Sequence, residues 1–199
     1  MLELLAYLQS IHPIQPEAQA MLGGMLKEQQ ILKGKHWLQQ GAICDRIAFI
    51  KKGLVRVYFE SGQKEVCLWY NKENEVMLSV HSFFSQAISN FAIQAIEDTT
   101  VFYITHQQLQ QVFDKHLDFN INGRRILEHY YSLSEMHVKM LLEQTSTRLD
   151  MMRSLYPWML DDGRITDKML AAFIGVSPEY FSRFKNKPRL INCKKSKAA

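Results

Sequence analysis

The sequence predicts an α+β protein in three parts: a block of strands, one long helix, and a pair of short helices near the C-terminus. Three patterns carry this prediction. Residues 31–105 contain β-rich runs broken at turn residues, residues 118–145 keep a helical period, and residues 166–187 space small and apolar side chains as two short helices joined by a tight turn. Because the strands form one block with helices before and after it, we assign the chain to the α+β class.

Composition is compatible with two domains and with a soluble protein. The 199 residues are 47% hydrophobic, enough for one sizeable core and a smaller second one. The chain has no run of about eighteen apolar residues, and the N-terminal MLELLAYLQS carries Glu3 and no basic leader. We therefore expect neither a membrane span nor a secretory signal, and we expect a cytoplasmic protein.

Cysteine and histidine usage gives no sign of a disulfide framework or a metal site. Cys44, Cys67 and Cys193 are odd in number and far apart, and no CxxC pair offers zinc-ligand spacing. The seven histidines form neither an HxH nor an HExxH pattern. No catalytic residue, metal or cofactor is predicted, and the chain is not expected to be an enzyme.

The first two-thirds of the chain begins with helices and continues with strands. Residues 1–30 have helical spacing with an interruption at Pro13 and Pro16. The run IAFIKKGLVRVYFESGQKEVCLWY breaks at a glycine and again at SG, where a tight hairpin turn is expected. Further strands are expected at 77–80, 91–96 and 101–104, followed by a short helix at about 106–113.

The long helix of residues 118–145 has two apolar lines, which suggests two packing partners. One line steps alternately by four and three residues, like a coiled-coil seam, and supplies the predicted dimer-interface residues Ile126, Tyr130, Leu133, His137 and Met140. The second line, Leu127, Tyr131, Val138 and Leu142, is expected to pack on the β-domain of its own chain. The alternative is a single-chain helix buried all round.

The segment TDKMLAAFIGVSPEYFSRFKNK predicts a helix-turn-helix. Its first helix presents one apolar face, Gly175 supplies the turn, and Val176, Phe181 and Phe184 close the same core from the second helix. Ser177 is placed as an N-cap, and Pro178 follows at the first helical position. A polar, arginine-bearing outer face is typical of a helix that reads the major groove, although an ordinary helical hairpin could have the same pattern.

Charge is distributed unevenly along the chain and favours a polyanionic partner. Residues 144–199 hold eleven Lys and Arg against five Asp and Glu, a net charge of +6, whereas residues 1–143 have a net charge of −2. No acidic residue follows Glu179. A lysine-rich end can also be simply solvated, but together with the two short helices it indicates phosphate contact.

This order of parts resembles the Crp/Fnr family of bacterial transcription regulators, and within it the branch found in Bacteroidetes. The resemblance is carried by GKHWLQQG, DRIAFIKKGLVRVYF, SGQKEV, SFFSQ and IQAIED in the first part and by GVSPEYFSR in the last. It implies a double-stranded β-helix, or jelly-roll, sensor of the cyclic-nucleotide-binding type at 1–117, a dimerisation helix at 118–145 and a helix-turn-helix DNA-binding domain at 146–199.

The sensor departs from its cyclic-AMP-binding relatives, which use an Arg-Ser pair for the cyclic phosphate and a Gly-Glu pair for the ribose. Ser89 and Asn90 stand at the Arg-Ser positions, and the segment from Val76 to Ile96 contains no Asp, Glu, Lys or Arg. A buried phosphate would lack its charged partner, so cyclic AMP is disfavoured. The candidate pocket residues are Met77, Ser79, His81, Ser89 and Asn90. Three cysteines cannot ligate an iron–sulfur cluster as in other relatives, whereas haem ligation by one His or Cys stays open.

The C-terminus also departs from the family, because only PRLINCKKSKAA remains where relatives carry a β-hairpin wing. On the pattern of the relatives, Glu179 and Arg183 would reach base edges, and the arginine would bind guanine O6 and N7. The other predicted DNA contacts position the phosphate backbone: Ser177, Tyr180, Ser182, Lys185 and Lys187.

The function indicated is a homodimeric, sequence-specific transcription regulator in which the β-roll biases the long helices and so the spacing of the two reading helices. The expected partners are double-stranded DNA, a second copy of the chain, RNA polymerase and an unidentified small-molecule effector, with no membrane contact. Two alternatives remain: a sensor or interaction module with weakened DNA binding, and a cupin-like metal enzyme, for which His36 and His81 are too few ligands in the β-region.

Overall fold

The computed structural model describes residues 1–62 and 64–185. It separates into two compact units, the first from Met1 to Ser132 and the second from Leu133 onward, and each is described by itself. The boundary falls inside the longest helix, α5 (Asn120–Leu142), so this helix contributes its first half to one unit and its second half to the other. The division at 117 and 145 expected from the sequence stays a prediction.

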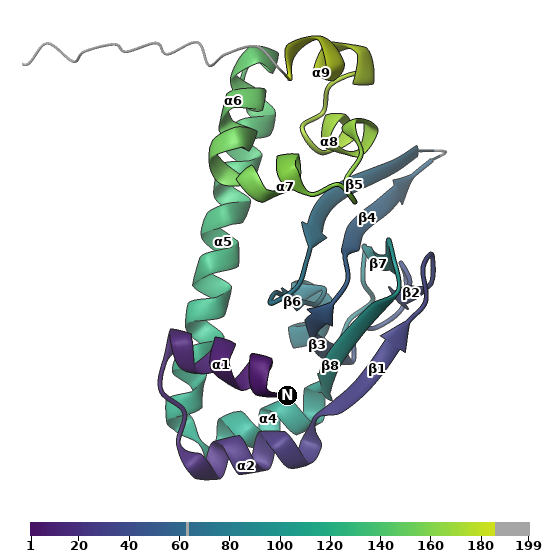
Figure 1. Cartoon of the computed structure of the whole chain (residues 1–199). Coiled ribbons are helices and arrows are strands. Elements are labelled where there is room, and N and C mark those ends of the chain that lie inside the picture. Colours follow the sequence, from purple (N-terminus) through teal and green to yellow (C-terminus); the bar gives the residue numbers. More distant parts are fainter. Residues whose placement is uncertain (63, 186–199) are drawn as a thin grey trace, which may run out of the picture. The chain divides into compact units, whose positions relative to one another are not determined.

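Eight strands of the N-terminal unit form two four-stranded sheets, in which every pairing between strands is antiparallel (Figure 1). One sheet has the order β1-β8-β3-β6 and the other the order β2-β7-β4-β5. The strands are β1 (Lys27–Ile31), β2 (His36–Leu38), β3 (Arg46–Lys52), β4 (Val55–Ser61), β5 (Lys64–Asn71), β6 (Val76–Met77), β7 (Ala92–Ala95) and β8 (Thr99–Thr105). The chain passes repeatedly from one sheet to the other, which winds the strands into a β-roll and confirms the mixed fold.

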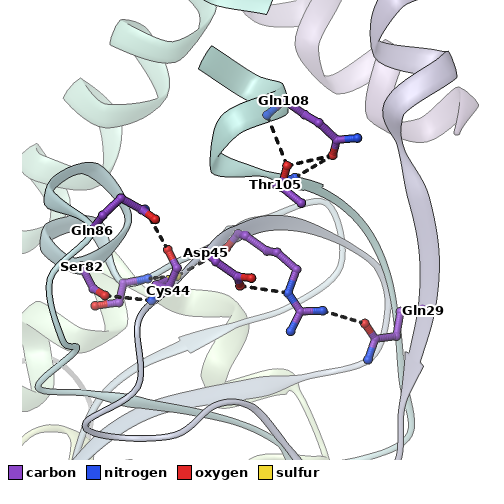
Figure 2. A network of polar contacts seen from close by, with 9 residues as sticks. Gln29, Cys44, Asp45, Ser82, Gln86, Thr105 and Gln108 are labelled. Carbon is purple, nitrogen blue, oxygen red and sulfur yellow. Dashed lines mark hydrogen bonds and ion pairs between the residues drawn. The ribbon is translucent and has the colours of Figure 1, made fainter. Parts of the chain in front are cut away.

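The helices of this unit precede and follow the strands, with one inserted between them. They are α1 (Leu2–Ile11), α2 (Pro16–Met25), α3 (Val80–Ser85), α4 (His106–Lys115), a 3-10 turn (Leu117–Phe119) and the start of α5. Pro16 occupies the first turn of α2, where its missing N–H costs nothing, so the predicted proline interruption is confirmed. Thr105 begins α4 with a reciprocal capping box to Gln108, visible in Figure 2.

Two glycines confirm the turns expected in the strand region. Gly62 has φ of 63° between β4 and β5, which pair from Val55↔Asn71 to Ser61↔Lys64 as a hairpin. Gly53, between β3 and β4, has φ of 114°, and a Cβ atom there would lie 2.4 Å from Oγ1 of Thr99. Glycine is therefore required at position 53 both by the backbone conformation and by the close approach of β8.

One expected strand is wrong, because residues 77–80 leave the sheet. Strand β6 ends at Met77 and α3 begins at Val80. The Ser82 hydroxyl accepts a hydrogen bond from the backbone N–H of Cys44 (2.9 Å) and donates to the carbonyl of Ala87 (2.5 Å), while Gln86 adopts the left-handed conformation that ends the helix. Figure 2 shows Ser82 and Gln86 directed at Cys44. These non-local bonds favour a helix where the local pattern indicates a strand.

The C-terminal unit is helical. After the second half of α5 it contains α6 (Thr145–Leu155), α7 (Pro157–Asp161), α8 (Asp167–Phe173) and α9 (Pro178–Phe184). Its core is made of buried apolar side chains from all of these helices and from the segments between them: Met140, Leu149, Met152, Tyr156, Met159, Ile165, Leu170, Ala171, Phe173, Ile174 and Phe181.

Candidate nucleic-acid interface

Helices α8 and α9 are joined by a short turn whose geometry follows from a few residues. The Thr166 hydroxyl accepts a hydrogen bond from the N–H of Met169 (3.3 Å) and begins α8, and the Ser177 hydroxyl accepts one from the N–H of Tyr180 (3.2 Å) and begins α9. Gly175 has φ of 67°, which a side chain would strain. The predicted N-cap, proline and turn glycine are all at these places.

The core between the two helices is close to the expected one. Leu170, Ala171, Ile174 and Phe181 are at most 3% exposed, as predicted. Phe184 is only half-buried, because its ring stacks on Tyr180 with centroids 4.4 Å apart rather than entering the core. A buried residue that sequence reasoning missed is Phe173; its position three residues after Leu170, on the same helical face, was the available signal.

The outer face of α9 is polar and accessible. Glu179, Ser182 and Arg183 are exposed, and Arg183 and Lys168 of α8 take part in no ion pair within the part of the chain that the structure describes. Exposed cationic groups on a helix surface are available for base edges and phosphates. Arg183 is therefore accessible on the outer face of α9, and its base-reading role stays a prediction.

The remaining predicted DNA contacts are less available. The Ser177 hydroxyl is engaged as the cap of α9, Tyr180 is half-buried against Phe184, and the Lys185 ammonium forms an ion pair with Asp167. Lys187 lies outside the described residues, as does the rest of the lysine-rich end. The Glu179 carboxylate accepts hydrogen bonds from its own backbone N–H and from the Ser177 hydroxyl, and both lower the pKa of Glu179. The carboxylate therefore helps to cap α9, the helix from which it was predicted to contact bases.

Two arginines of α6 that contribute to the positive charge of residues 144–199 are engaged within the chain. The Nη1 atom of Arg148 donates to the carbonyls of Ile174 (3.3 Å) and Gly175 (3.1 Å), and its Nε atom donates to Glu143 (2.8 Å). Nη2 of Arg153 donates to the carbonyls of Phe184 and Lys185 at the end of α9. Apart from the nearby backbone carbonyl of Glu143, the acceptors are backbone carbonyls 26 to 32 residues further on, for which the sequence carries no signal.

The predicted sensor pocket is split between the interior and the surface. Met77, Ser79 and Ser89 are at most 5% exposed, whereas His81 and Asn90 are exposed. The Ser89 hydroxyl lies 2.9 Å from that of Ser79 and 2.8 Å from the carbonyl of Phe91. The two buried hydroxyls therefore satisfy each other without a ligand.

A separate hollow of about 170 Å³ lies on the loop before β3. It is lined by Trp37, Leu38, Gln39, Ala42, Ile43, Cys44, Asp45 and Arg46. The Arg46 guanidinium lies over the Trp37 ring, 4.3 Å from its centroid, and donates to Gln29 (3.2 Å) and Asp45 (3.2 Å). The guanidinium is thus oriented by residues of the chain itself, while the Arg46 and Asp45 side chains stay 30% and 67% exposed.

The two apolar lines of α5 are interchanged relative to the sequence prediction. Of the residues assigned to the dimer interface, Met140 and His137 are 0% and 6% exposed, Ile126 and Tyr130 pack against the core of the β-roll unit, and Leu133 is half-buried. The hydroxyl of Tyr130 accepts a hydrogen bond from the N–H of Val76 (3.1 Å).

The other line of α5 is the one left accessible. Tyr131, Val138 and Leu142 are 68%, 57% and 82% exposed, and Leu127 is half-buried. The line assigned to a partner thus packs on its own chain, and the line assigned to its own chain faces outward. Sequence periodicity identifies both lines, but it does not say which of them meets which neighbour.

His137 illustrates this packing. Its ring lies between Phe173, with centroids 4.5 Å apart, and Tyr156, at 6.0 Å. Burial lowers the pKa of His137 from 6.5 to about 4, and it raises the pKa of Tyr156. Both side chains are therefore neutral at physiological pH and belong to the core of the C-terminal unit.

No helix in the described ranges is both long enough and apolar enough to cross a membrane. The same residues contain no group of three His, Cys, Asp or Glu side chains that could hold a metal ion, and Cys44 and Cys67 are free thiols.

Comparison with known proteins finds similar domains and folds. Residues 28–116 match the family model of the cyclic nucleotide-binding domain. No curated protein sequence matches the chain. Among solved structures, a CooA variant from Carboxydothermus hydrogenoformans is 19% identical, with a TM-score of 0.66 over 88% of this chain and 81% of that one.

Two further solved structures are similar over most of their length. FixK2 from Bradyrhizobium japonicum is 15% identical, with a TM-score of 0.67 over 79% of this chain and 81% of that one. The c-di-GMP-responsive global regulator CLP of Xanthomonas campestris is 14% identical, with a TM-score of 0.63 over 85% and 89%.

The β-roll part of the chain is thus similar to cyclic nucleotide-binding domains over residues 28–116. The chain as a whole has the fold of the Crp/Fnr-type transcription regulators, and the resemblance seen in the sequence is confirmed at the level of the fold. Its assignment to the Bacteroidetes branch stays a prediction.

Proposed function

We propose that this chain is a homodimeric, sequence-specific DNA-binding transcription regulator in which α8 and α9 form a helix-turn-helix and α9 is the recognition helix. The observation that carries the proposal is the two-sided character of α9. Its Phe181 is fully buried in the core of the unit, while Glu179, Ser182 and Arg183 are exposed on the opposite side. A helix fixed by one apolar side chain, with an accessible arginine beside it, has the form needed to enter a major groove.

The electrostatics of the unit support a focused rather than a diffuse contact with DNA. Arg153 and Arg164 are paired with Asp150 (2.9 Å) and Asp162 (2.7 Å), so part of the positive charge counted in the sequence is used within the chain. The exposed cations of α8 and α9 remain for phosphates and bases. The same reduction in free charge favours the alternative of a regulator-like module with weakened DNA binding.

The homodimer is proposed on the exposed line of α5. Leu127, Tyr131, Val138 and Leu142 recur at intervals of four and seven residues on one helix, and three of them are more than half exposed. Pairing two copies along this line would cover apolar surface and bring together two reading helices. Twofold symmetry then fits a palindromic operator with half-sites about 34 Å apart.

The effector and the other partners are proposals of the same kind. Cyclic AMP is disfavoured, because the segment from Val76 to Ile96 carries no charged side chain and the Ser79 and Ser89 hydroxyls bond to each other. A different, uncharged small molecule and RNA polymerase remain as proposed partners, with the cytoplasm as the site of action.

Selection of bound duplexes from a random DNA pool with the purified full chain tests this function. The proposal predicts enrichment of a palindromic consensus whose half-sites are separated by one helical turn. Enrichment of no sequence above the input pool would remove sequence-specific binding and leave the weakened module. A consensus without twofold symmetry would remove the dimeric arrangement.

A further inference from the structure

We infer that Arg148 and Arg153 of α6 are positioning residues for the DNA-reading helices, each capping the carboxyl end of one helix of the pair, and are not phosphate contacts. The inference rests on the proposed function and extends it to two residues outside the predicted DNA contacts. Arg148 serves the end of α8, and Arg153 serves the end of α9.

Arg148 holds the turn between the two helices. Its Nη1 atom donates to the carbonyls of Ile174 and Gly175, the residues that end α8 and form the turn. A Cβ atom on Gly175 would lie 3.2 Å from this same Nη1 atom, so the absence of a side chain at position 175 is also what admits the guanidinium. The hydrogen bonds therefore carry the assignment, and the glycine, which φ of 67° favours on its own, leaves room for the guanidinium beside the turn.

Arg153 holds the end of the recognition helix. Its Nη2 atom donates to the carbonyls of Phe184 and Lys185, the last residue of α9 and its C-cap. Its Nη1 atom donates to Asp150 at 2.9 Å, one turn earlier on α6, and the Arg153 side chain is only 15% exposed. The Asp150 carboxylate thus orients the Arg153 guanidinium toward the end of α9. Little of the guanidinium remains accessible to solvent or to a phosphate.

The chemistry suits this role. The last carbonyls of a helix have no partner within it and lie at the negative end of the helix dipole, where a planar guanidinium can serve two of them at once. Helices α8 and α9 are seven residues each, too short to be stable alone, so their ends depend on such contacts.

Helix α6 supports both helices of the pair through these two arginines. Both belong to α6, and Nε of Arg148 also donates to the carbonyl of Glu143, directly after the last residue of α5. A single helix that follows α5 therefore sets the ends of both α8 and α9. We expect displacement of α6 to move the turn and the recognition helix together.

Hydrogen exchange of the free protein tests the caps without DNA. In Arg148→Lys the amides of Ile174 and Val176, and in Arg153→Lys the amide of Lys185, should exchange about tenfold faster or more. Lysine keeps the charge, but its single nitrogen cannot bind the carbonyls and also keep the second contact, to Glu143 or to Asp150, that orients the guanidinium. Unchanged exchange at these amides would overturn the inference. Native exchange at the amide of Tyr156, which bonds to the carbonyl of Met152 within the C-terminal unit, shows in the same spectra that this unit is folded in each variant.

Binding to a selected operator and to a scrambled duplex then separates positioning from phosphate contact. Positioning predicts that Arg148→Lys and Arg153→Lys lose about tenfold on the operator and less than about twofold on the scrambled duplex, with an unchanged salt slope. The matched control Lys168→Met, which removes an exposed charge of α8, should weaken both duplexes equally. Equal losses on both duplexes for Arg148→Met, with a salt slope reduced by about 0.9, would make Arg148 a phosphate contact and refute its positioning role.

Different results would reject the arginine caps and the proposed DNA-binding function. Faster exchange in both lysine variants, together with a wild-type chain that selects no DNA sequence, would keep the caps and reject the proposed function. Sequence-specific binding by the wild-type chain, with native exchange in both variants, would keep the function and reject the caps.

Discussion

The burial of His137 predicts that the C-terminal unit loses stability as the pH falls below 6.5. The ring lies between Phe173 and Tyr156 and is 6% exposed. Burial lowers its pKa to about 4 in the folded chain, whereas the unfolded chain keeps the ordinary value of 6.5. Between these two values the unfolded state binds one more proton than the folded state, so stability is complete above pH 6.5 and falls as the pH drops toward 4.

The magnitude follows from the difference between the two pKa values. At about 1.4 kcal/mol for each pKa unit, the change from 6.5 to about 4 corresponds to roughly 3 kcal/mol of unfolding free energy. That is a large share of the roughly 5–15 kcal/mol that stabilises a typical domain. Below pH 4 the contribution of His137 should become constant, because the ring is then protonated in both states.

Urea unfolding at a series of pH values between 4 and 7.5, followed by circular dichroism, measures this effect. The variant His137→Phe keeps an aromatic ring between Phe173 and Tyr156 and removes the titrating group, so its stability relative to wild type should rise by roughly 3 kcal/mol as the pH falls from 7 to 4. The exposed His81, changed to Gln, is the matched control and should leave the pH dependence as it is. Parallel curves for wild type and His137→Phe would refute the reasoning.

Three further predictions concern the β-roll and the assembly. Gly53→Ala should destabilise the chain by about 2 kcal/mol or more, because the added Cβ would lie 2.7 Å from the Cα of Thr99. The control Gly24→Ala has open space around it and should not destabilise the chain. Equal unfolding midpoints for the two variants would contradict this prediction. Calorimetry with cyclic AMP and cyclic GMP should give no saturable heat, because the segment between β6 and β7 is uncharged; a micromolar isotherm would count against it. Tyr131→Glu combined with Val138→Glu should give a monomer in sedimentation, and a persistent dimer with full DNA affinity would exclude the exposed line of α5 as the interface.

Local chemistry made much of the fold predictable. Pro16, Gly53, Gly62, Gly175 and Ser177 each act on the backbone within a few residues, and the structure has the expected helix starts or turns at all five. Such residues restrict φ and ψ or satisfy a helix end directly. Their effect does not depend on where the rest of the chain lies, which is why the sequence alone is sufficient to place them.

Non-local contacts account for what was mispredicted. Residues 77–80 have a strand-like pattern, yet hydrogen bonds of Ser82 to Cys44 and Ala87 favour the helix that starts at Val80. The faces of α5 were interchanged because Met140 is an acceptable residue for either face, and only the packing of the second unit shows that it is buried. Both errors come from tertiary neighbours that a one-dimensional period does not identify.

The candidate site was predictable in its outline but not in its connections. The outward position of Arg183 follows from helical spacing against Phe181. The caps formed by Arg148 and Arg153 were missed, because a charge count treats every arginine as equally free to meet a phosphate. Only three-dimensional proximity distinguishes an arginine that binds its own carbonyls from one that is available to DNA.

The central claim, that α9 reads base edges through Arg183, is tested most directly by comparing the sequences selected by wild type and by Arg183→Ala from the same random DNA pool. We predict that the variant loses preference at one symmetric pair of positions, keeps the rest of the consensus, and binds the wild-type operator more weakly by ~1–3 kcal/mol per half-site, as expected when a bidentate contact to guanine is removed. An unchanged consensus with equal affinity losses on operator and scrambled DNA would contradict the account and leave Arg183 a phosphate contact.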